Sequence, residues 1–150
     1  MDRDKIIAKA MWWLYAAALL IFVSAKFDGS LSALSKRLFQ GPAHFNFEPF
    51  KTFRLQWKYF FTRWGYRNML GNLLPFMPLG VLPALAYPRL SSPRRRFGTA
   101  LLFILGLELF QLITRLGSFD VDDILLNTLG AALGFGIEIL ARGPGHNTRT

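Results

Sequence analysis

Four long apolar runs constrain this chain more than any other feature of its sequence. They lie at residues 6–25, 69–87, 97–116 and 121–141. Each run is close to the length of roughly 20 residues that a helix needs to cross the hydrocarbon core of a bilayer. The sequence therefore predicts an all-α membrane protein with about four transmembrane helices, folded as a single domain over residues 1–150.

The charge of the chain favours a membrane surface over nucleic acid. Its formal net charge is +9, and 52% of its residues are hydrophobic. The basic residues lie between the apolar runs, where the anionic head groups of lipids would meet them. We therefore expect membrane lipids, and no nucleic acid, as partners. The chain contains no cysteine, which excludes disulfides, thiolate metal sites and a cysteine nucleophile.

The first apolar run has two interpretations. Its strictly apolar part, residues 11–25, follows a charged start and ends in Val23-Ser24-Ala25, which fits a secretory signal peptide with a small-residue cleavage site. Extended back to Ile6, the run reaches the length of a spanning helix. We favour a retained helix.

The second apolar run contains residues that break helices. These are Pro75, Pro78 and Pro83, together with Gly71 and Gly80. In water such a segment would not be a helix, whereas in a bilayer neighbouring helices can satisfy the backbone carbonyls that proline leaves free. We expect a kinked or partly unwound span that faces the protein interior.

The long loop between the first two spans is expected to contain an amphipathic helix at the membrane interface. Aromatic side chains recur at nearly helical spacing across residues 50–64, and basic side chains occupy positions between them. This pattern is typical of a helix that lies flat, with its aromatic face in the membrane and its basic face toward phosphates. The alternative is an ordinary core helix of a small soluble lobe. The aromatic residues are Phe50, Phe53, Trp57, Phe60, Phe61 and Trp64, and the basic ones are Lys51, Arg54, Lys58 and Arg63.

Basic residues in the short second loop predict the orientation of the chain. Arg89 and the run Arg94 to Arg96 lie there, and loops rich in Lys and Arg stay in the cytoplasm. Four spans then place both termini in the cytoplasm and the long first loop outside.

Polar side chains within or next to the spans are the candidate functional residues, because a charged group costs roughly 2.5 to 3.5 kcal/mol near the centre of a span. Helical spacing places those of the third span on one face, and those of the fourth span on another. Because successive spans run in opposite directions, all of these residues lie toward the same membrane surface. They are Asn72, Glu108, Gln111, Arg115, Asp120, Asp123 and Asn127.

These residues predict a polar pocket that opens to the outer surface. Glu108 and Asp123 would form an ionisable pair, and are the candidate catalytic residues. Asn72, Gln111 and Asn127 would orient a ligand by hydrogen bonds. Arg115 would bind an anion such as a lipid phosphate, and Asp120 would contribute at the rim. The structural alternative is that buried polar groups only hold the helices together, that Asp122 faces water and that Asp120 is the N-cap of the fourth helix.

We expect no cofactor and no metal. His44 and His146 lie outside the spans and far apart in the sequence, which argues against zinc. The sequence has no glycine-rich phosphate loop and no nucleophile elbow. A divalent cation held by Glu108, Asp120 and Asp123 is a further alternative. The residues leave open whether the protein catalyses a reaction.

Four motifs occur in order along the chain, at residues 46–50 (NFEPF), 71–80 (GNLLPFMPLG), 108–111 (ELFQ) and 117–130 (GSFDVDDILLNTLG). Together they resemble the VanZ-like family of bacterial membrane proteins. The resemblance covers roughly residues 46–134 and implies an integral membrane protein of the bacterial envelope, whose namesake is associated with low-level resistance to the glycopeptide teicoplanin. Many members carry an arginine just before the Phe-Asp pair, where this chain has Ser118, so that role passes to Arg115 or is absent here.

The sequence thus predicts a multi-pass protein of the bacterial cytoplasmic membrane whose outward-facing pocket binds or modifies a lipid or a lipid-linked envelope precursor. One alternative is a non-catalytic module that assembles with another membrane protein, or with its own copies, through the face that carries Gly130 and Gly134. Another is a small transporter subunit, in which Pro75 and Pro78 mark a broken helix.

Overall fold

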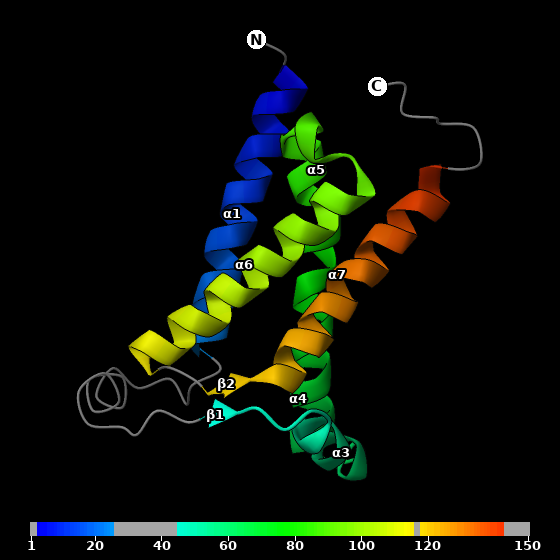
Figure 1. The fold of residues 1–150 in the computed structure, drawn as a ribbon. Helices are drawn as coiled ribbons and strands as arrows, with labels where there is room; N and C mark the ends of the chain where they lie inside the picture. The colour runs from blue at the N-terminus through cyan, green and yellow to red at the C-terminus, as the bar shows by residue number, and fades with distance from the viewer. Residues whose placement is uncertain (1–2, 26–44, 116–117, 143–150) are drawn as a thin grey trace.

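The computed structural model describes residues 3–25, 45–115 and 118–142 of the chain. Four helical segments in this part are long and apolar enough to cross a membrane, which confirms the expected all-α, multi-pass architecture. Figure 1 shows that the first helix begins, and the last helix ends, at the same end of the bundle.

The helices follow the predicted spans closely, with short elements between them. The first span is α1 (Arg3–Ala25), the third is α6 (Pro93–Thr114) and the fourth is α7 (Val121–Arg142). The second span is composite: α4 (Arg63–Leu73), the 3-10 helix η1 (Leu74–Gly80) and α5 (Leu82–Ala86), followed by a short turn η2 (Pro88–Leu90). Helix α3 (Lys51–Lys58) lies at the end of the bundle opposite to η2 (Figure 1). Two short strands lie at the same end and pair in parallel; they are β1 (Phe45–Asn46) and β2 (Phe119–Asp120).

The second span is unwound at its prolines, as the sequence predicts. Pro75 opens η1 and Pro78 lies within it, so the regular pattern of α-helical hydrogen bonds stops there. The hydroxyl of Tyr15 on α1 donates to the carbonyl oxygen of Pro75 at 2.7 Å. A neighbouring helix therefore satisfies a backbone group within the broken span, which is what a bilayer interior requires.

Glycines allow α7 to pack directly on the unwound segment. A Cβ atom at Gly130 would overlap the carbonyl oxygen of Leu73, and one at Gly134 would overlap that of Met77. A Cβ atom at Gly80 of η1 would likewise overlap the carbonyl oxygen of Ala131 on α7. The face of α7 that carries Gly130 and Gly134 is therefore packed against the second span of the same chain.

The first span buries one stripe of its surface. Trp12, Ala16, Leu19 and Val23 are buried, and their spacing of three to four residues places them on one face of α1. The ring of Trp12 lies 5.4 Å from that of Phe103 on α6. This stripe packs α1 against the rest of the bundle.

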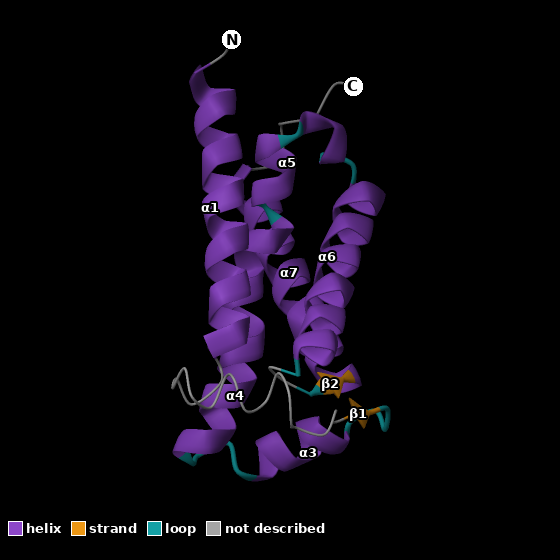
Figure 2. Cartoon of the chain, turned by 90° about the vertical axis from the view of Figure 1, so that its left-hand side faces the viewer, coloured by secondary structure: helices purple, strands orange, loops and turns teal. Residues whose placement is uncertain are grey.

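The aromatic segment folds as two helices rather than one. Helix α3 ends at Lys58, and α4 begins at Arg63, where the Thr62 hydroxyl accepts the backbone N–H of Gly65 at 3.2 Å. A single helix over residues 50–64 is therefore wrong, and the second span begins earlier than residue 69. Helix α3 runs across the end of the bundle rather than along the spans, as expected of an interfacial helix (Figure 2).

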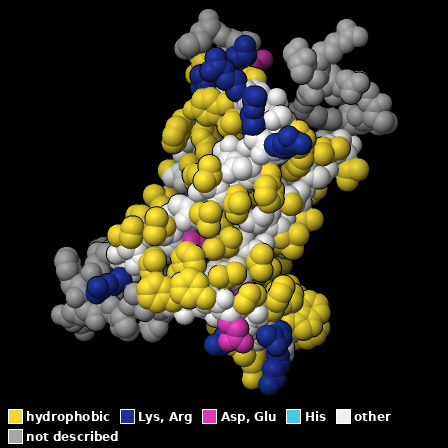
Figure 3. All heavy atoms as spheres, in the orientation of Figure 1, with side chains coloured by type: hydrophobic (Ala, Val, Ile, Leu, Met, Phe, Trp, Pro, Cys, Tyr) yellow, Lys and Arg dark blue, Asp and Glu magenta, His cyan; other side chains and the backbone are white. Residues whose placement is uncertain are grey.

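The outer surface of the bundle is largely hydrophobic. In Figure 3 the Lys and Arg side chains gather toward the two ends of the helices, while hydrophobic side chains cover most of the surface between them. Leu14, Leu102 and Leu140 are 71%, 72% and 82% exposed. An apolar surface of this extent is unfavourable in water and fits contact with lipid chains.

The packing of α7 on η1 makes a test with a matched control on the same helix. Gly134→Ala should lower the melting temperature in detergent, because the new methyl group overlaps backbone, and overpacking of this kind costs about 1–3 kcal/mol. A Cβ atom at Gly136 would meet no atom of another described helix within 4 Å, so Gly136→Ala should melt like the wild type. Equal melting temperatures for the two variants would contradict the close contact.

Candidate functional site

Helix α7 carries two polar side chains that reach two different helices. Asp123 and Asn127 lie four residues apart, and so on one face of the helix. The side-chain amide of Asn72 on α4 donates to Asp123 Oδ1. The amide of Asn127 donates to Glu108 Oε1 on α6 at 3.4 Å. Through these contacts α7 connects the second span to the third.

Gln111 extends these contacts to the first span. It lies three residues after Glu108 on α6, and its Nε2 donates to the carbonyl oxygen of Val23 on α1 at 3.4 Å. All four spans are thus joined by polar side chains. We call this set the interhelical network; it consists of Asn72, Glu108, Gln111, Asp123 and Asn127.

Four of the five residues of the interhelical network are buried, and Asp123 is half-buried. Asn72, Glu108 and Asn127 are each 2% exposed, and Gln111 is 7% exposed. The predicted pocket that opens to the surface is therefore not the arrangement seen in the described part of the chain. Within that part, Asn127 Oδ1 is buried and accepts no hydrogen bond. A group that donates a hydrogen bond would satisfy this oxygen.

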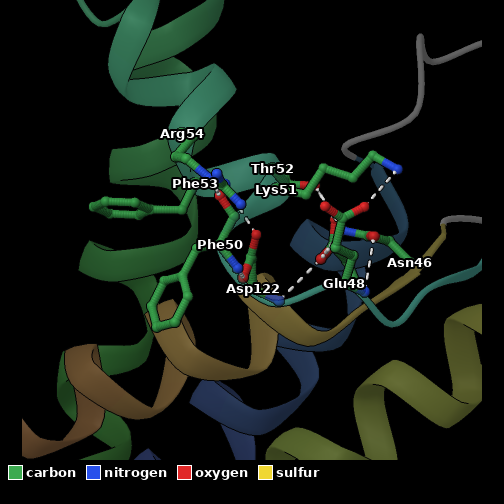
Figure 4. A network of polar contacts seen from close by, with 9 residues as sticks. Asn46, Glu48, Phe50, Lys51, Thr52, Phe53, Arg54 and Asp122 are labelled. Atoms are coloured by element: carbon green, nitrogen blue, oxygen red, sulfur yellow. Dashed lines mark hydrogen bonds and ion pairs between the residues drawn. The ribbon is translucent and has the colours of Figure 1, made fainter.

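Asp122 holds the N-terminus of α3. Its Oδ1 accepts the backbone N–H of Phe50 at 2.6 Å, and its Oδ2 accepts that of Phe53 at 3.0 Å (Figure 4). A carboxylate in this position satisfies backbone donors that the first turn of a helix leaves unpaired, and it meets the positive end of the helix dipole. Asp122 is 1% exposed, so the expectation that it faces water is wrong.

Asp120 connects the same segment to the start of α7. Its Oδ1 accepts from the Asn46 side-chain amide at 3.0 Å and from the backbone N–H of Asp122 at 2.9 Å, and its Oδ2 accepts from the Thr52 hydroxyl at 2.6 Å. The contact with the N–H of Asp122 is that of an N-cap, which agrees with the structural alternative. Since both oxygens accept hydrogen bonds from the protein, Asp120 is a structural residue in this arrangement, not a rim ligand. Together, Asp120 and Asp122 form what we call the aspartate clamp.

Arg115 lies outside the interhelical network. It ends α6 in the left-handed conformation, with φ of 56°, and its side chain is exposed. The prediction that Arg115 shares the buried face of Glu108 and Gln111 is wrong, because the helix stops before that turn is complete.

The acidic residues do not gather into a metal site. Among the described residues, no group of three or more His, Cys, Asp or Glu is placed to hold a metal ion. The alternative of a cation bound by Glu108, Asp120 and Asp123 is therefore not supported, since the carboxylate of Asp120 is turned to Asn46 and Thr52.

Sequence reasoning missed an ion pair at the other end of the bundle. Arg96 on α6 pairs with Glu138 on α7, and their side chains are only 7% and 10% exposed. The sequence placed Arg96 with the charges of a loop. Its spacing of four residues from Ala100, and of eight from Ile104, would have placed it on the buried face of α6.

Comparisons with known proteins agree with the predicted resemblance. A family model described as VanZ/LLP1 matches residues 12–142. The protein VanZ of Enterococcus faecium is 32% identical over 75 residues, which are 49% of this chain and 46% of that relative. The match thus spans less than half of the relative's length. No solved structure matches the chain.

The aspartate clamp makes a test of how residues 45–58 are held. Asp122→Ala leaves two backbone N–H groups without their acceptor, and loss of such partners costs about 1–3 kcal/mol. Trypsin should then cleave faster after Lys51, Arg54 and Lys58 in detergent, as followed by intact mass spectrometry.

The matched control for the clamp is Glu48→Gln. Glu48 pairs with Lys51 on the surface, where their side chains are 60% and 64% exposed, so its loss should not change the cleavage rate. If Asp122→Ala and Glu48→Gln are cleaved at the same rate, the clamp does not hold the segment.

Proposed function

Since this chain belongs to the VanZ/LLP1 family, we propose that it binds or modifies an amphipathic lipid or lipid-linked envelope precursor through the interhelical network. We further propose that it does so in the bacterial cytoplasmic membrane, and that it influences the response to teicoplanin-type glycopeptides. The similarity to protein VanZ of Enterococcus faecium supports the proposed influence on the response to glycopeptides.

One observation carries the proposal: two carboxyl groups, those of Glu108 and Asp123, lie within spans, and each accepts a hydrogen bond from a side-chain amide of another helix. Glu108 is 2% exposed and contacts Asn127, which lies one turn from Asp123 on α7. Ionisable groups in spans are costly, whereas amides and hydroxyls are enough to hold helices together. The presence of two carboxyl groups therefore favours a chemical or binding role over packing alone.

The network matches a ligand that donates hydrogen bonds. The carboxyl oxygens of Glu108 and Asp123 are acceptors, and Asn127 Oδ1 is a buried acceptor with no donor among the described residues. Sugar hydroxyls and amines, which are common in lipid head groups and lipid-linked precursors, are donors of this kind. In this proposal Asn72, Gln111 and Asn127 orient the head group, and Glu108 and Asp123 exchange protons with it.

The network lies close to the membrane interface from which a head group would approach. Asp123 directly follows Asp122, which holds α3 against the end of the bundle. The network therefore begins one residue beyond the aspartate clamp, below a helix that carries Lys51, Arg54 and Lys58. Arg115 is exposed at the same end of the bundle, where it would meet a lipid phosphate.

We place the end of the bundle that carries Arg89, Arg94 and Arg95 in the cytoplasm. These arginines are exposed near the short connection from α5 to α6, and Lys and Arg in short loops favour the cytoplasmic side. With that orientation the interhelical network, α3 and the aspartate clamp lie toward the outer face.

The amide variants Glu108→Gln and Asp123→Asn test the proposal, because each retains the oxygen that accepts the described hydrogen bond. A role in packing alone predicts that both variants behave like the wild type. We expect instead that one class of lipid copurifies with the wild type and is lost from both variants, as measured by mass spectrometry. Cells that express the variants should also lose any shift in teicoplanin susceptibility that the wild type confers.

The control is Tyr15→Phe, which removes a buried hydrogen bond between spans but no carboxyl group. It should retain the lipid class of the wild type. If the two amide variants carry the same lipids as the wild type and Tyr15→Phe, the carboxyl groups are structural and the proposal is wrong.

A further inference from the structure

A cavity lies between α6, α7 and η1, farther along α7 than the interhelical network. Its volume is about 260 Å³. Small residues make up much of its wall: Gly80 on η1, Ala100 on α6, and Ala131 and Ala132 on α7. The lining extends along α7 from Thr128 to Phe135, seven residues or roughly 10 Å at helical rise. The cavity is therefore long enough for a segment of extended chain.

The apolar wall of this cavity gains dispersion contacts when hydrocarbon fills it. The solvent around these spans is hydrocarbon, and Phe97, which lines the cavity, is 54% exposed on the outer surface. Hydrocarbon chains of lipids are thus the groups that reach the cavity at the highest concentration. Part of one hydrocarbon chain fits a cavity of this volume, which lies below the range of roughly 300–1,000 Å³ that is usual for drug-sized ligands.

Two buried polar atoms show that hydrocarbon alone does not complete the site. Arg96 Nε and Thr128 Oγ1 belong to lining residues, and neither has a hydrogen-bond partner within the described part of the chain. Arg96 is 8% exposed; its other nitrogens contact Glu138, and its guanidinium lies 4.7 Å from the ring centre of Phe135. An Nε–H donor requires an acceptor, and the ester oxygens at the start of a lipid chain are acceptors.

Exposed arginines lie beside the end of the cavity that Arg96 and Pro93 form. Arg94 and Arg95 are both exposed, and Nη1 of Arg95 donates to the carbonyl oxygen of Arg89 at 2.8 Å, which holds it near the chain surface. Guanidinium groups bind phosphate oxygens strongly, and clusters of them at the end of a span favour anionic lipids. We therefore propose that this cavity binds one chain of an anionic phospholipid, with its ester group at Arg96 and its phosphate at Arg94 and Arg95.

A variant that fills the cavity tests where the hydrocarbon chain of the lipid binds. Ala132 lines the cavity and Ala141 does not, yet both are exposed alanines on α7. The proteins are purified in detergent micelles that contain phosphatidylglycerol, and bound lipid is counted by native mass spectrometry. We expect one phosphatidylglycerol on the wild type and on Ala141→Leu, and loss of that lipid from Ala132→Leu. Retention of the lipid by a folded Ala132→Leu protein would overturn the proposal.

A second comparison tests the head group without changing the cavity. In micelles that contain equal amounts of phosphatidylglycerol and phosphatidylcholine, the wild type should retain phosphatidylglycerol preferentially. Combined Arg94→Gln and Arg95→Gln substitutions, which alter only exposed side chains, should abolish that preference. A wild type that retains both lipids equally, or a double variant that keeps the preference, would contradict the assignment of the phosphate.

This proposal is independent of the one for the interhelical network. Glu108 does not line the cavity, so Glu108→Gln should retain phosphatidylglycerol even where it loses the ligand of the network. Loss of phosphatidylglycerol from Glu108→Gln, with retention by Ala132→Leu, would assign the lipid to the network and overturn the cavity site.

Discussion

The contact between α7 and the unwound part of the second span determines much of this structure. Prolines end the regular helix at η1, and the backbone groups that this leaves need partners within the protein, because a bilayer interior supplies none. Tyr15 donates to one carbonyl, and the glycines of α7 bring that helix directly against others. Once α7 is fixed on η1, its rotation about its own axis is fixed as well.

That rotation decides which helices the polar side chains of α7 can reach. With Gly130 and Gly134 against η1, Asp123 reaches Asn72 on α4, and Asn127 reaches Glu108 on α6. The glycines and the polar residues of α7 therefore act together. Close packing at the glycines positions the polar groups that a bilayer would otherwise exclude. The same helix places Glu138 beside Arg96 at its other end. Its polar contacts thus lie at both ends of the bundle, while lipid-facing hydrophobic residues cover most of the surface between.

The sequence was sufficient where periodicity and the bilayer dictate the structure. Apolar runs predicted the spans, and the prolines predicted the broken second span, because both follow from local backbone and solvation rules. Local sequence patterns did not predict the structure where contacts between residues far apart in the sequence determine it. The aromatic pattern continues past Lys58, yet α3 ends there and a new helix starts after Thr62. The acidic side chains that hold the start of α3 come from a segment about seventy residues later, which no local pattern shows.

The acidic residues at the start of α7 show why fewer residues belong to the candidate site than the sequence predicted. Three aspartates lie within four positions, and composition alone gives them equal claim to a functional role. Asp120 and Asp122 are turned to residues 46–53, where backbone and side-chain donors occupy their oxygens. Asp123 lies on another face of the helix, toward Asn72. Asp120 and Asp122 therefore hold the interfacial segment, whereas Asp123 lies toward the membrane interior. Among the acidic residues predicted for the site, Glu108 and Asp123 are the two that accept hydrogen bonds from amides of other membrane-spanning helices, Asn127 and Asn72.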